Sequence, residues 1–428
     1  MKVPVLLPKI FNYPLTYISS STEVFKTGDF VEVPFGKNKE IGVVWSKIQI
    51  TDKKIKLRKI NKKINKISID EKLIKFIDWF SVYNVVPKGM VLKMCLGDKK
   101  NILKIENKKN SQINIKKNKY SLNKEQKIAF NNLSKLGNKF NVSVLHGVTG
   151  SGKTLVYFEL IKNILKKNKQ VLVLLPEIFL TNQFQDRFLD FFGSIPSIWH
   201  SKITQKNKRR IWQGVIKNEI KLVIGARSSL LLPFKDLGLI IVDEEHDPSY
   251  KQEEGLIYNA RDMAITRASI ENFPITLVSS IPSLETFNHI KNKKYNYTKI
   301  SKRFNDHPLP ETKIINLNLK KIKNEYIAAE TTEIVNQYLF NNEQVLFFLN
   351  RRGYAPFLIC KKCGYKHICP DCSIYLTYHK SLKKIICHHC GYQNSINKKC
   401  IDGKNNCDFT MYGPGVEKIF DELKFKYF

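Results

Sequence analysis

The chain has 428 residues, enough for about two to four domains. Lys and Arg total 72 against 38 Asp and Glu, giving a formal net charge of +34 that favours a polyanionic partner such as nucleic acid. Much of the excess is lysine beside abundant Asn and Ile, so an AT-rich genome explains it equally well. No apolar run approaches the roughly 18 residues of a membrane span, and the start lacks a secretory signal. We expect a cytoplasmic protein without membrane contact.

Residues 1–97 are predicted to form a small β-rich domain. Short apolar runs at 4–8, 30–36 and 41–45, broken by turn residues, indicate strands. Residues 70–83 carry apolar side chains at helical spacing, which is more typical of a core-facing helix than of a binding surface. Residues 98–120 are rich in Lys, Asn and Ile without periodicity, so we expect a basic, flexible linker.

Residues 147–154 match the phosphate-binding pattern G-x-x-x-x-G-K-[ST]. A strand-like run at 142–145 precedes it and a helix-like run at 155–161 follows, which is the context that the pattern requires; a chance glycine turn is the alternative. Backbone N–H groups of such a loop cradle phosphates, while Lys153 reaches the β/γ-phosphates and Thr154 can bind Mg²⁺. The predicted ATP-binding residues are Gly147, Val148, Thr149, Gly150, Ser151, Gly152, Lys153 and Thr154.

An apolar run at 237–242 ends in the three carboxylates Asp243, Glu244 and Glu245. In P-loop enzymes an Asp in this place holds Mg²⁺, and a following Glu can polarise the attacking water. We therefore expect Lys153, Asp243 and Glu244 to be catalytic, with a solvated acidic turn as the alternative. A helical pattern that opens at 122–126 also places Gln126 where many nucleotide-driven motors read adenine, although the spacing alone is a weak signal.

Strand-like runs at 170–175, 221–224 and 275–278 alternate with helical segments, so residues 121–300 are predicted to form a RecA-like α/β lobe, here called lobe 1. The loops gather at the carboxyl ends of the strands, where such sheets bind ligands. A further strand-like run at 344–349 is predicted to begin a second lobe within residues 301–358.

Cysteines dominate the region that follows, as three C-x2-C pairs and two single residues. Paired thiolates on tight turns suit tetrahedral Zn²⁺, and a reducing compartment makes disulfides a poor alternative. His388 or His389 could replace one thiolate, and Cys95, far from the others, is expected to be an inert, partly buried thiol. We predict two Zn²⁺ ions in residues 359–410, bound by Cys360, Cys363, Cys369, Cys372, Cys387, Cys390, Cys400 and Cys407.

Several motifs together resemble the PriA family of primosomal replication-restart helicases. They lie at 122–126, 147–154, 176–178, 225–228, 243–247 and 348–353. The resemblance implies a superfamily 2, ATP-dependent 3′→5′ DNA helicase that recognises stalled forks, acts with primosome proteins and single-stranded DNA-binding protein, and helps reload the replicative helicase. It implies that residues 1–97 recognise the 3′ end of a nascent DNA strand. It also implies an inner zinc ion on Cys369, Cys372, Cys387 and Cys390, and an outer one on Cys360, Cys363, Cys400 and Cys407.

The chain departs from the family pattern in four places. The linker stands where a winged-helix domain is expected, Ser279-Ser280-Ile281-Pro282 replaces Ser-Ala-Thr-Pro, and Leu256 replaces an aromatic residue. The second lobe resumes at 411–428 and then stops, without the Gln- and Arg-bearing motif that completes the ATP site. The alternative to a helicase is therefore a DNA-binding scaffold for primosome assembly whose motor has decayed.

Overall fold

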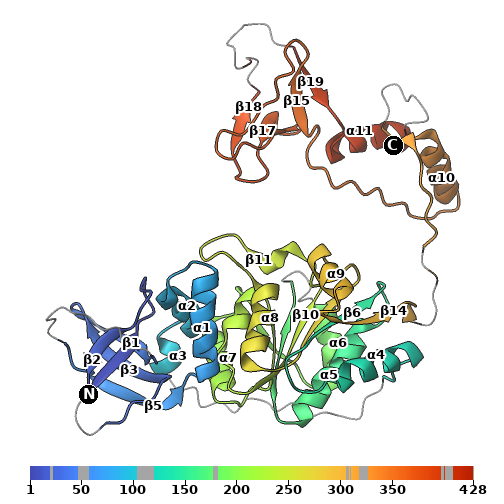
Figure 1. The fold of residues 1–428 in the computed structure, drawn as a ribbon. Helices are drawn as coiled ribbons and strands as arrows, with labels where there is room; N and C mark the ends of the chain where they lie inside the picture. The colour runs from blue at the N-terminus through green and yellow to red at the C-terminus, as the bar shows by residue number, and fades with distance from the viewer. Residues whose placement is uncertain are drawn as a thin grey trace. The chain divides into compact units, whose positions relative to one another are not determined.

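The structure is a computed structural model that describes residues 1–19, 23–46, 57–103, 120–176, 182–304, 308, 310–317, 326–396, 400 and 408–427. The chain divides into two compact units, Met1–Leu309 and Pro310–Phe428 (Figure 1). Among the described residues, every helix is too short or too polar to cross a bilayer. The domain boundaries predicted within the two units stay predictions.

The first unit begins with an antiparallel sheet whose strands run in the order β2-β1-β4-β3-β5. Alternate residues face opposite sides: Val31 and Val33 pack under one face, while Phe30 points to the other and meets the helices that follow. The strand predictions at 30–36 and 41–45 are confirmed within a few residues, and that at 4–8 is confirmed for its first half. The strands are β1 (Lys2–Leu6), β2 (Leu15–Ile18), β3 (Asp29–Phe35), β4 (Asn38–Val44) and β5 (Lys62–Ser68).

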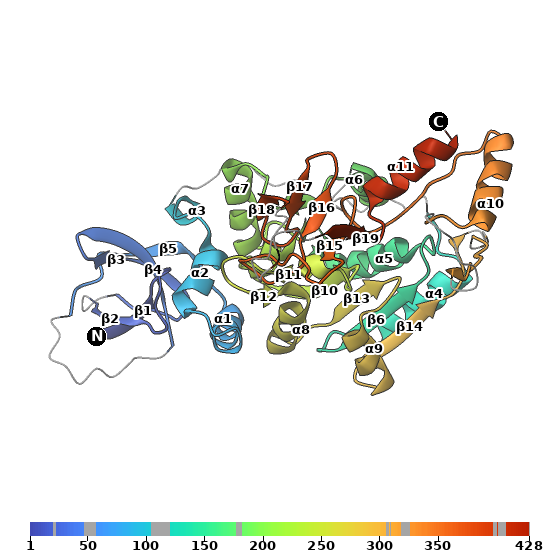
Figure 2. The ribbon, with the colours of Figure 1, turned by 90° about the horizontal axis from the view of Figure 1, so that it is seen from above.

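Three helices lie between this sheet and the larger one: α1 (Glu71–Tyr83), α2 (Lys88–Leu96) and α3 (Lys100–Leu103) (Figures 1 and 2). The Asp70 side chain caps α1 by accepting a hydrogen bond from the Lys72 amide, which confirms the predicted helix at 70–83. Helix α2 was not predicted, because its apolar residues show almost no periodicity.

The linker prediction is wrong at its first residues. Helix α3 buries Asn101 and Ile102, and the Gln213 side chain donates to the Asn101 carbonyl at 2.7 Å. Nearby, the Trp212 indole donates to the Cys95 carbonyl at 2.8 Å. Composition gave no sign of these tertiary contacts, which fix the segment against the helix at 205–216. The rest of the predicted linker, 104–119, lies outside the described residues.

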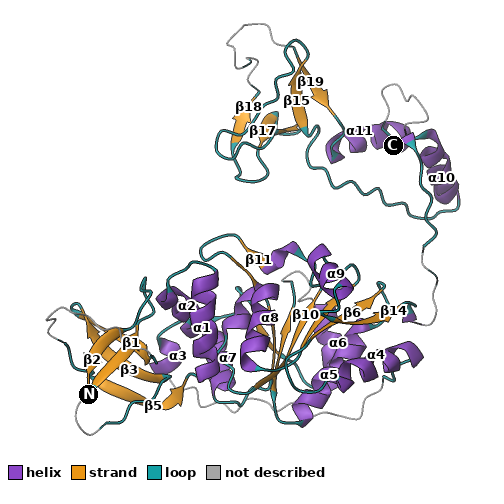
Figure 3. Cartoon of the chain, in the orientation of Figure 1, coloured by secondary structure: helices purple, strands orange, loops and turns teal. Residues whose placement is uncertain are grey.

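The larger sheet has seven parallel strands in the order β14-β6-β13-β10-β7-β9-β8. Because both faces are covered, its strands read as continuous apolar runs. Leu172 and Leu174 face the core shared with α7 and α8, while Val171 and Val173 face the core under α4, α5 and α6 (Figure 3). The strands are β6 (Val142–Gly147), β7 (Gln170–Leu174), β8 (Ser197–Trp199), β9 (Leu222–Gly225), β10 (Leu237–Asp243), β13 (Ile275–Ser279) and β14 (Asn296–Ile300).

The predicted α/β lobe is therefore confirmed as a fold class. Its helices are α4 (Lys124–Lys135), α5 (Lys153–Lys166), α6 (Asn182–Phe192), α7 (Gln205–Ile216), α8 (Ala260–Glu271) and α9 (Leu284–Lys291). Short 3₁₀ helices at Arg227–Leu231 and Pro248–Tyr250 and a hairpin of β11 (Lys251–Gln252) and β12 (Tyr258–Asn259) lie on the loops after β9 and β10.

The described residues of the second unit form two small antiparallel sheets and two helices. Strands β15 (Phe357–Cys360) and β19 (Phe409–Tyr412) form one sheet, and β16 (Thr377–His379), β17 (Lys384–Ile386) and β18 (Gln393–Ser395) form the other. The helices are α10 (Ala329–Phe340) and α11 (Val416–Tyr427).

The predicted strand at 344–349 is wrong. These residues have no regular structure, and Leu346 and Phe348 are 89% and 84% exposed. No described strand pairs with them, so their backbone lacks the ladder hydrogen bonds that would hold an extended apolar run in a sheet.

Candidate nucleotide and metal sites

The P-loop lies where β6 ends and α5 begins. Gly150 and Gly152 have φ of +81° and +76°, in the left-handed region that glycine adopts without strain. A Cβ atom on Gly147 would lie 2.5 Å from the Ser151 hydroxyl oxygen, so the loop also needs glycine there for space. The backbone geometry thus fits a tight phosphate-binding turn at a helix N-terminus.

Lys153 is buried inside this turn. Its amine donates to the Gly147 carbonyl at 2.7 Å and to the Val148 carbonyl at 3.5 Å. Burial lowers the pKa of the amine, and the carboxylates of Glu244 and Asp243 oppose that shift. A cation whose hydrogen bonds go to carbonyl oxygens is well placed to exchange them for phosphate oxygens.

Asp243 ends β10, which is separated from β6 by β13. Burial first, and the neighbouring Glu244 second, raise the pKa of the Asp243 carboxyl to about 6. The Tyr157 hydroxyl donates to one carboxylate oxygen at 2.9 Å, and the Glu244 amide donates to the other at 3.0 Å. Burial and the Asp243 carboxylate raise the pKa of the Tyr157 hydroxyl, and the Thr154 side chain acts against that rise, so Thr154 and Asp243 both lie beside Tyr157. The two predicted Mg²⁺ ligands are therefore close to one another.

Gln126 reaches the P-loop in a way that the sequence did not predict. Its side-chain oxygen accepts from the Asn123 amide at 2.9 Å and its nitrogen donates to the Ser151 carbonyl at 2.9 Å. Asn123 returns a hydrogen bond, so the pair forms a capping box at the start of α4. Gln126 is fully buried with both ends of its amide occupied, and the adenine contact stays a prediction.

A segment after β14 also holds the P-loop, and sequence reasoning missed it. The Arg303 guanidinium donates from Nε to the Thr149 carbonyl at 3.1 Å, and the Phe304 amide donates to the Gly150 carbonyl at 2.9 Å. Glu125 accepts from the Ser301 amide at 3.0 Å. The only signal was positional: 301–304 follow a parallel strand, whose carboxyl end must lie beside the P-loop.

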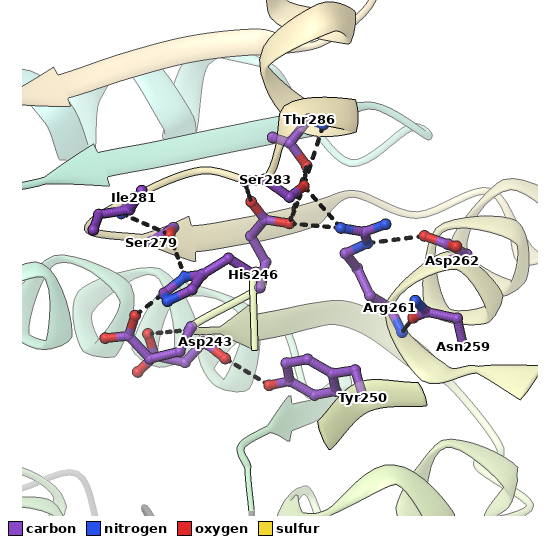
Figure 4. A network of polar contacts seen from close by, with 12 residues as sticks. Asp243, His246, Tyr250, Asn259, Arg261, Asp262, Ser279, Ile281, Ser283 and Thr286 are labelled. Carbon is purple, nitrogen blue, oxygen red and sulfur yellow. Dashed lines mark hydrogen bonds and ion pairs between the residues drawn. The ribbon is translucent and has the colours of Figure 1, made fainter. Parts of the chain in front are cut away.

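The acidic motif is linked to the end of β13, as Figure 4 shows. His246 Nδ1 lies 2.8 Å from the Ser279 hydroxyl, which also accepts from the Ile281 amide at 3.0 Å. The Ile281 side chain itself is 71% exposed. Ser279, the first residue of the altered Ser-Ser-Ile-Pro segment, therefore provides the contact with the acidic motif.

Glu245 is the centre of a second part of this network, which was not predicted. It is 1% exposed and accepts hydrogen bonds from the Ser283 amide (2.7 Å), the Thr286 hydroxyl (3.0 Å) and the Arg261 guanidinium (3.1 Å) (Figure 4). Arg261 also donates to Asp262 at 2.8 Å. The third carboxylate of the motif thus joins β10 to the starts of α8 and α9.

The second unit brings cysteines together in two groups. The sulfurs of Cys369, Cys372, Cys387 and Cys390 all lie within 4.8 Å of one another, as do those of Cys360, Cys363 and Cys400. Contacts of 3.3 to 3.8 Å join pairs within the groups. Tetrahedral Zn–S bonds of ~2.3 Å place sulfurs about 3.8 Å apart, so the first group fits Zn²⁺.

The remaining predictions about the cysteines have different outcomes. Cys407 lies outside the described residues, as does 177–178 of the motif after β7. Neither group contains a histidine among the described residues, and His388 Nε2 instead lies 2.9 Å from His379 Nε2. Cys95 belongs to neither group and is fully rather than partly buried, which raises the pKa of its thiol to about 12.

Three family models match the chain. The 3′DNA-binding domain (3′BD) of PriA matches residues 2–97, the PriA DNA helicase Cys-rich region matches 369–394, and the type III restriction enzyme res subunit matches 119–277. The replication restart protein PriA of Rickettsia conorii is 42% identical over 98% of this chain and 64% of its own length. That of Haemophilus influenzae is 41% identical over 74% of this chain and 43% of its own length.

The chain belongs to the PriA family. Its two family-specific matches fall on different units: the antiparallel sheet with α1 and α2 in the first, and the inner cysteine group in the second. The chain spans 64% of the length of the PriA proteins from Rickettsia felis and Rickettsia conorii.

Proposed function

We propose that this PriA-family chain binds Mg·ATP in lobe 1 and acts in a 3′→5′ DNA helicase of replication restart. The observation that carries the proposal is the hydrogen bond of 2.9 Å from the Tyr157 hydroxyl to Asp243, because it links the acidic motif to α5, the helix that the P-loop begins. Phosphate is assigned to the loop from Gly147 to Thr154, and Mg²⁺ to Thr154 and Asp243.

In this proposal each residue has one task. Lys153 leaves the carbonyls of Gly147 and Val148 and binds the β/γ-phosphates. Thr154 and Asp243 hold the cation, which neutralises charge on the transferring phosphoryl group when bound. Glu244 orients the attacking water; its backbone has a φ of +48°, and its amide donates a hydrogen bond to Asp243.

Calorimetry with Mg·ADP on the wild-type chain and on Lys153→Ala tests the nucleotide site. Because a charge-assisted hydrogen bond is worth about 1.5–3 kcal/mol, we expect the affinity to fall by roughly 10- to 150-fold. Lys162→Ala, on the same helix but paired with Glu159, is the matched control and should bind as the wild type does. Equal affinities for wild type and Lys153→Ala would remove the assignment.

Steady-state ATPase and forked-duplex unwinding assays test the motor. DNA-stimulated hydrolysis that disappears in Glu244→Gln would support the helicase. DNA and nucleotide binding without turnover would support the alternative, a DNA-binding scaffold for primosome assembly. Glu253→Gln changes an exposed carboxylate on the loop after β10 and should leave the rate unchanged, which controls for the removal of one charge.

We also propose two zinc ions, an inner one on Cys369, Cys372, Cys387 and Cys390 and an outer one on Cys360, Cys363, Cys400 and Cys407. The two separate sulfur groups support this count. Elemental analysis should give about two zinc per chain, from the eight thiolates at four per ion. One zinc per chain, unchanged in Cys400→Ser, would show that the outer site does not exist.

The proposed DNA partner is a fork or single strand whose 3′ end binds residues 1–97, within a cytoplasmic assembly of primosome proteins and single-stranded DNA-binding protein. The family-model match over 2–97 and the net charge of +34 support it. Anisotropy with forks that end in a 3′ hydroxyl or a 3′ phosphate tests the end recognition, because an unpaired phosphate would disfavour a site built for the hydroxyl. Identical affinities would argue for phosphate contacts alone.

A further inference from the structure

Three aromatic side chains lie together in the part of the second unit that runs from β15 to β19 and contains both cysteine groups, called the zinc module below. Phe357 in β15 and Tyr412 in β19 face each other across the antiparallel pair, with ring centroids 5.4 Å apart and ring planes 18° from parallel. The Tyr375 ring centroid lies 5.9 Å from that of Phe357. Tyr375 and Tyr412 are 48% and 58% exposed. These three rings are called the aromatic ledge below.

A lysine lies over the aromatic ledge. Lys366 Nζ is 5.0 Å from the centroid of the Phe357 ring and 5.2 Å from that of Tyr375. Among the described residues no carboxylate forms an ion pair with Lys366, whereas the nearby Lys361 pairs with Asp408 at 3.2 Å. The ledge therefore carries a positive charge that is held by the rings and is not neutralised.

The ledge is built on the turns that carry the zinc ligands. The Cys360 amide donates to the Tyr365 carbonyl at 2.9 Å, directly before Lys366. The Cys369 amide donates to the Ile374 carbonyl at 2.8 Å, directly before Tyr375. Lys366 and Tyr375 are therefore each one residue from a hydrogen bond that fixes a cysteine, and the same turns hold the metal ligands and the ledge.

We propose that the aromatic ledge binds unpaired nucleotides of a DNA strand, with a base stacked on an exposed tyrosine face and Lys366 against the phosphate. The inference rests on the proposed function, in which the chain binds DNA. Exposed rings beside a free cation are the arrangement that binds single strands without sequence preference, because every base has a stacking face. An apolar protein surface would bury the Lys366 charge without a counter-ion, whereas a phosphate supplies one.

Fluorescence anisotropy with a labelled oligo-dT strand and the zinc-loaded full chain tests the proposal. Tyr375→Ala with Tyr412→Ala should weaken single-strand binding by roughly tenfold, from the loss of one or two stacked bases. Binding to a blunt duplex, whose bases are not available for stacking, should not change. Tyr338→Ala, which removes a tyrosine that is 48% exposed on α10, is the matched control and should bind as the wild type does.

Lys366→Gln gives an independent readout. Removing one phosphate contact on a single strand should reduce the slope of log K against log salt by about 0.7, and Lys366→Arg should restore it. Zinc content equal to that of the wild type shows that each variant is folded. Tyr375→Phe with Tyr412→Phe keeps the stacking faces and should bind normally.

The possible results separate the ledge from the function on which it rests. Wild-type affinity in the double alanine variant, with zinc retained, overturns the ledge and leaves DNA binding by the rest of the chain intact. An equal loss of single-strand and duplex binding also overturns it, since stacking cannot explain that pattern. If the wild-type chain binds no DNA at all, the proposed function fails and takes the ledge with it.

Discussion

Lobe 1 and the zinc module position their functional groups by different physical means. In lobe 1 the P-loop and the acidic motif lie at the ends of β6 and β10, strands that are buried on both faces by apolar side chains. In the zinc module the buried cluster is Leu358, Cys369, Leu376, Tyr378, Ile385 and Cys387, so two of its six members are predicted metal ligands. The first site is preorganised by hydrophobic burial, whereas we expect the second to depend on the zinc proposed above.

Removing zinc is the strongest test of this difference between the two regions. Structural Zn²⁺ contributes apparent binding free energies of about 10–16 kcal/mol, far more than a cluster of this size can replace. We expect a chelator to abolish hydrogen-exchange protection in β15 to β19 and to leave protection in β6, β10 and β13 unchanged. Exchange measured by mass spectrometry on the intact chain resolves both regions at once. Equal loss in both would show that lobe 1 also depends on the metal.

The next prediction concerns the buried carboxylate of lobe 1. Glu245→Ala leaves Arg261 without its buried partner and leaves the Ser283 amide unsatisfied, and breaking such a pair costs about 3–5 kcal/mol. Denaturant unfolding followed by protection in β10 should show that loss, with zinc content unchanged. Glu254→Ala, on the exposed loop after β10, is the control and should change stability by less than about 0.5 kcal/mol.

The ligand residues of both sites were predictable because each stands in a local pattern. The P-loop needs glycines at fixed spacing, and zinc needs C-x2-C pairs, so seven of the eight predicted cysteines are found in two groups. Arg303 and Glu245 were not predictable as contacts, since the partner of Arg303 is more than a hundred residues away and those of Glu245 lie at the starts of α8 and α9. The strand at 344–349 failed for the same reason: its apolar run was read without knowing whether a neighbouring strand exists.

A smaller effect should follow from loosening the P-loop on the side of β14. Arg303→Ala removes the hydrogen bond to Thr149, while Phe304 still holds Gly150 and Gln126 still holds Ser151, so the loop loses only one of its anchors. We expect Mg·ADP affinity to fall about 3- to 10-fold, for roughly 0.5–1.5 kcal/mol of one hydrogen bond. Lys302→Ala, the exposed neighbour, is the control. An unchanged affinity in Arg303→Ala would mean that the strands and the remaining hydrogen bonds fix the loop without Arg303.

The smallest expected effect concerns Cys95 of α2, and it tests whether α2 and lobe 1 share one hydrophobic core. Burial raises the pKa of the Cys95 thiol from 9.0 to about 12. A group whose pKa is raised by folding stabilises the protein fully below pH 9, and that stability is lost as pH rises from 9 towards 12, because the unfolded thiol ionises first.

Between pH 8 and pH 10 the wild type should lose about 1 kcal/mol more stability than Cys95→Ala, measured as the difference in unfolding free energy between the two proteins at each pH. Cys95→Ala also leaves a cavity, but that cost is the same at both pH values and cancels. Equal pH dependence in the two proteins would mean that α2 opens from lobe 1 before the sheet unfolds and exposes the thiol in the native state.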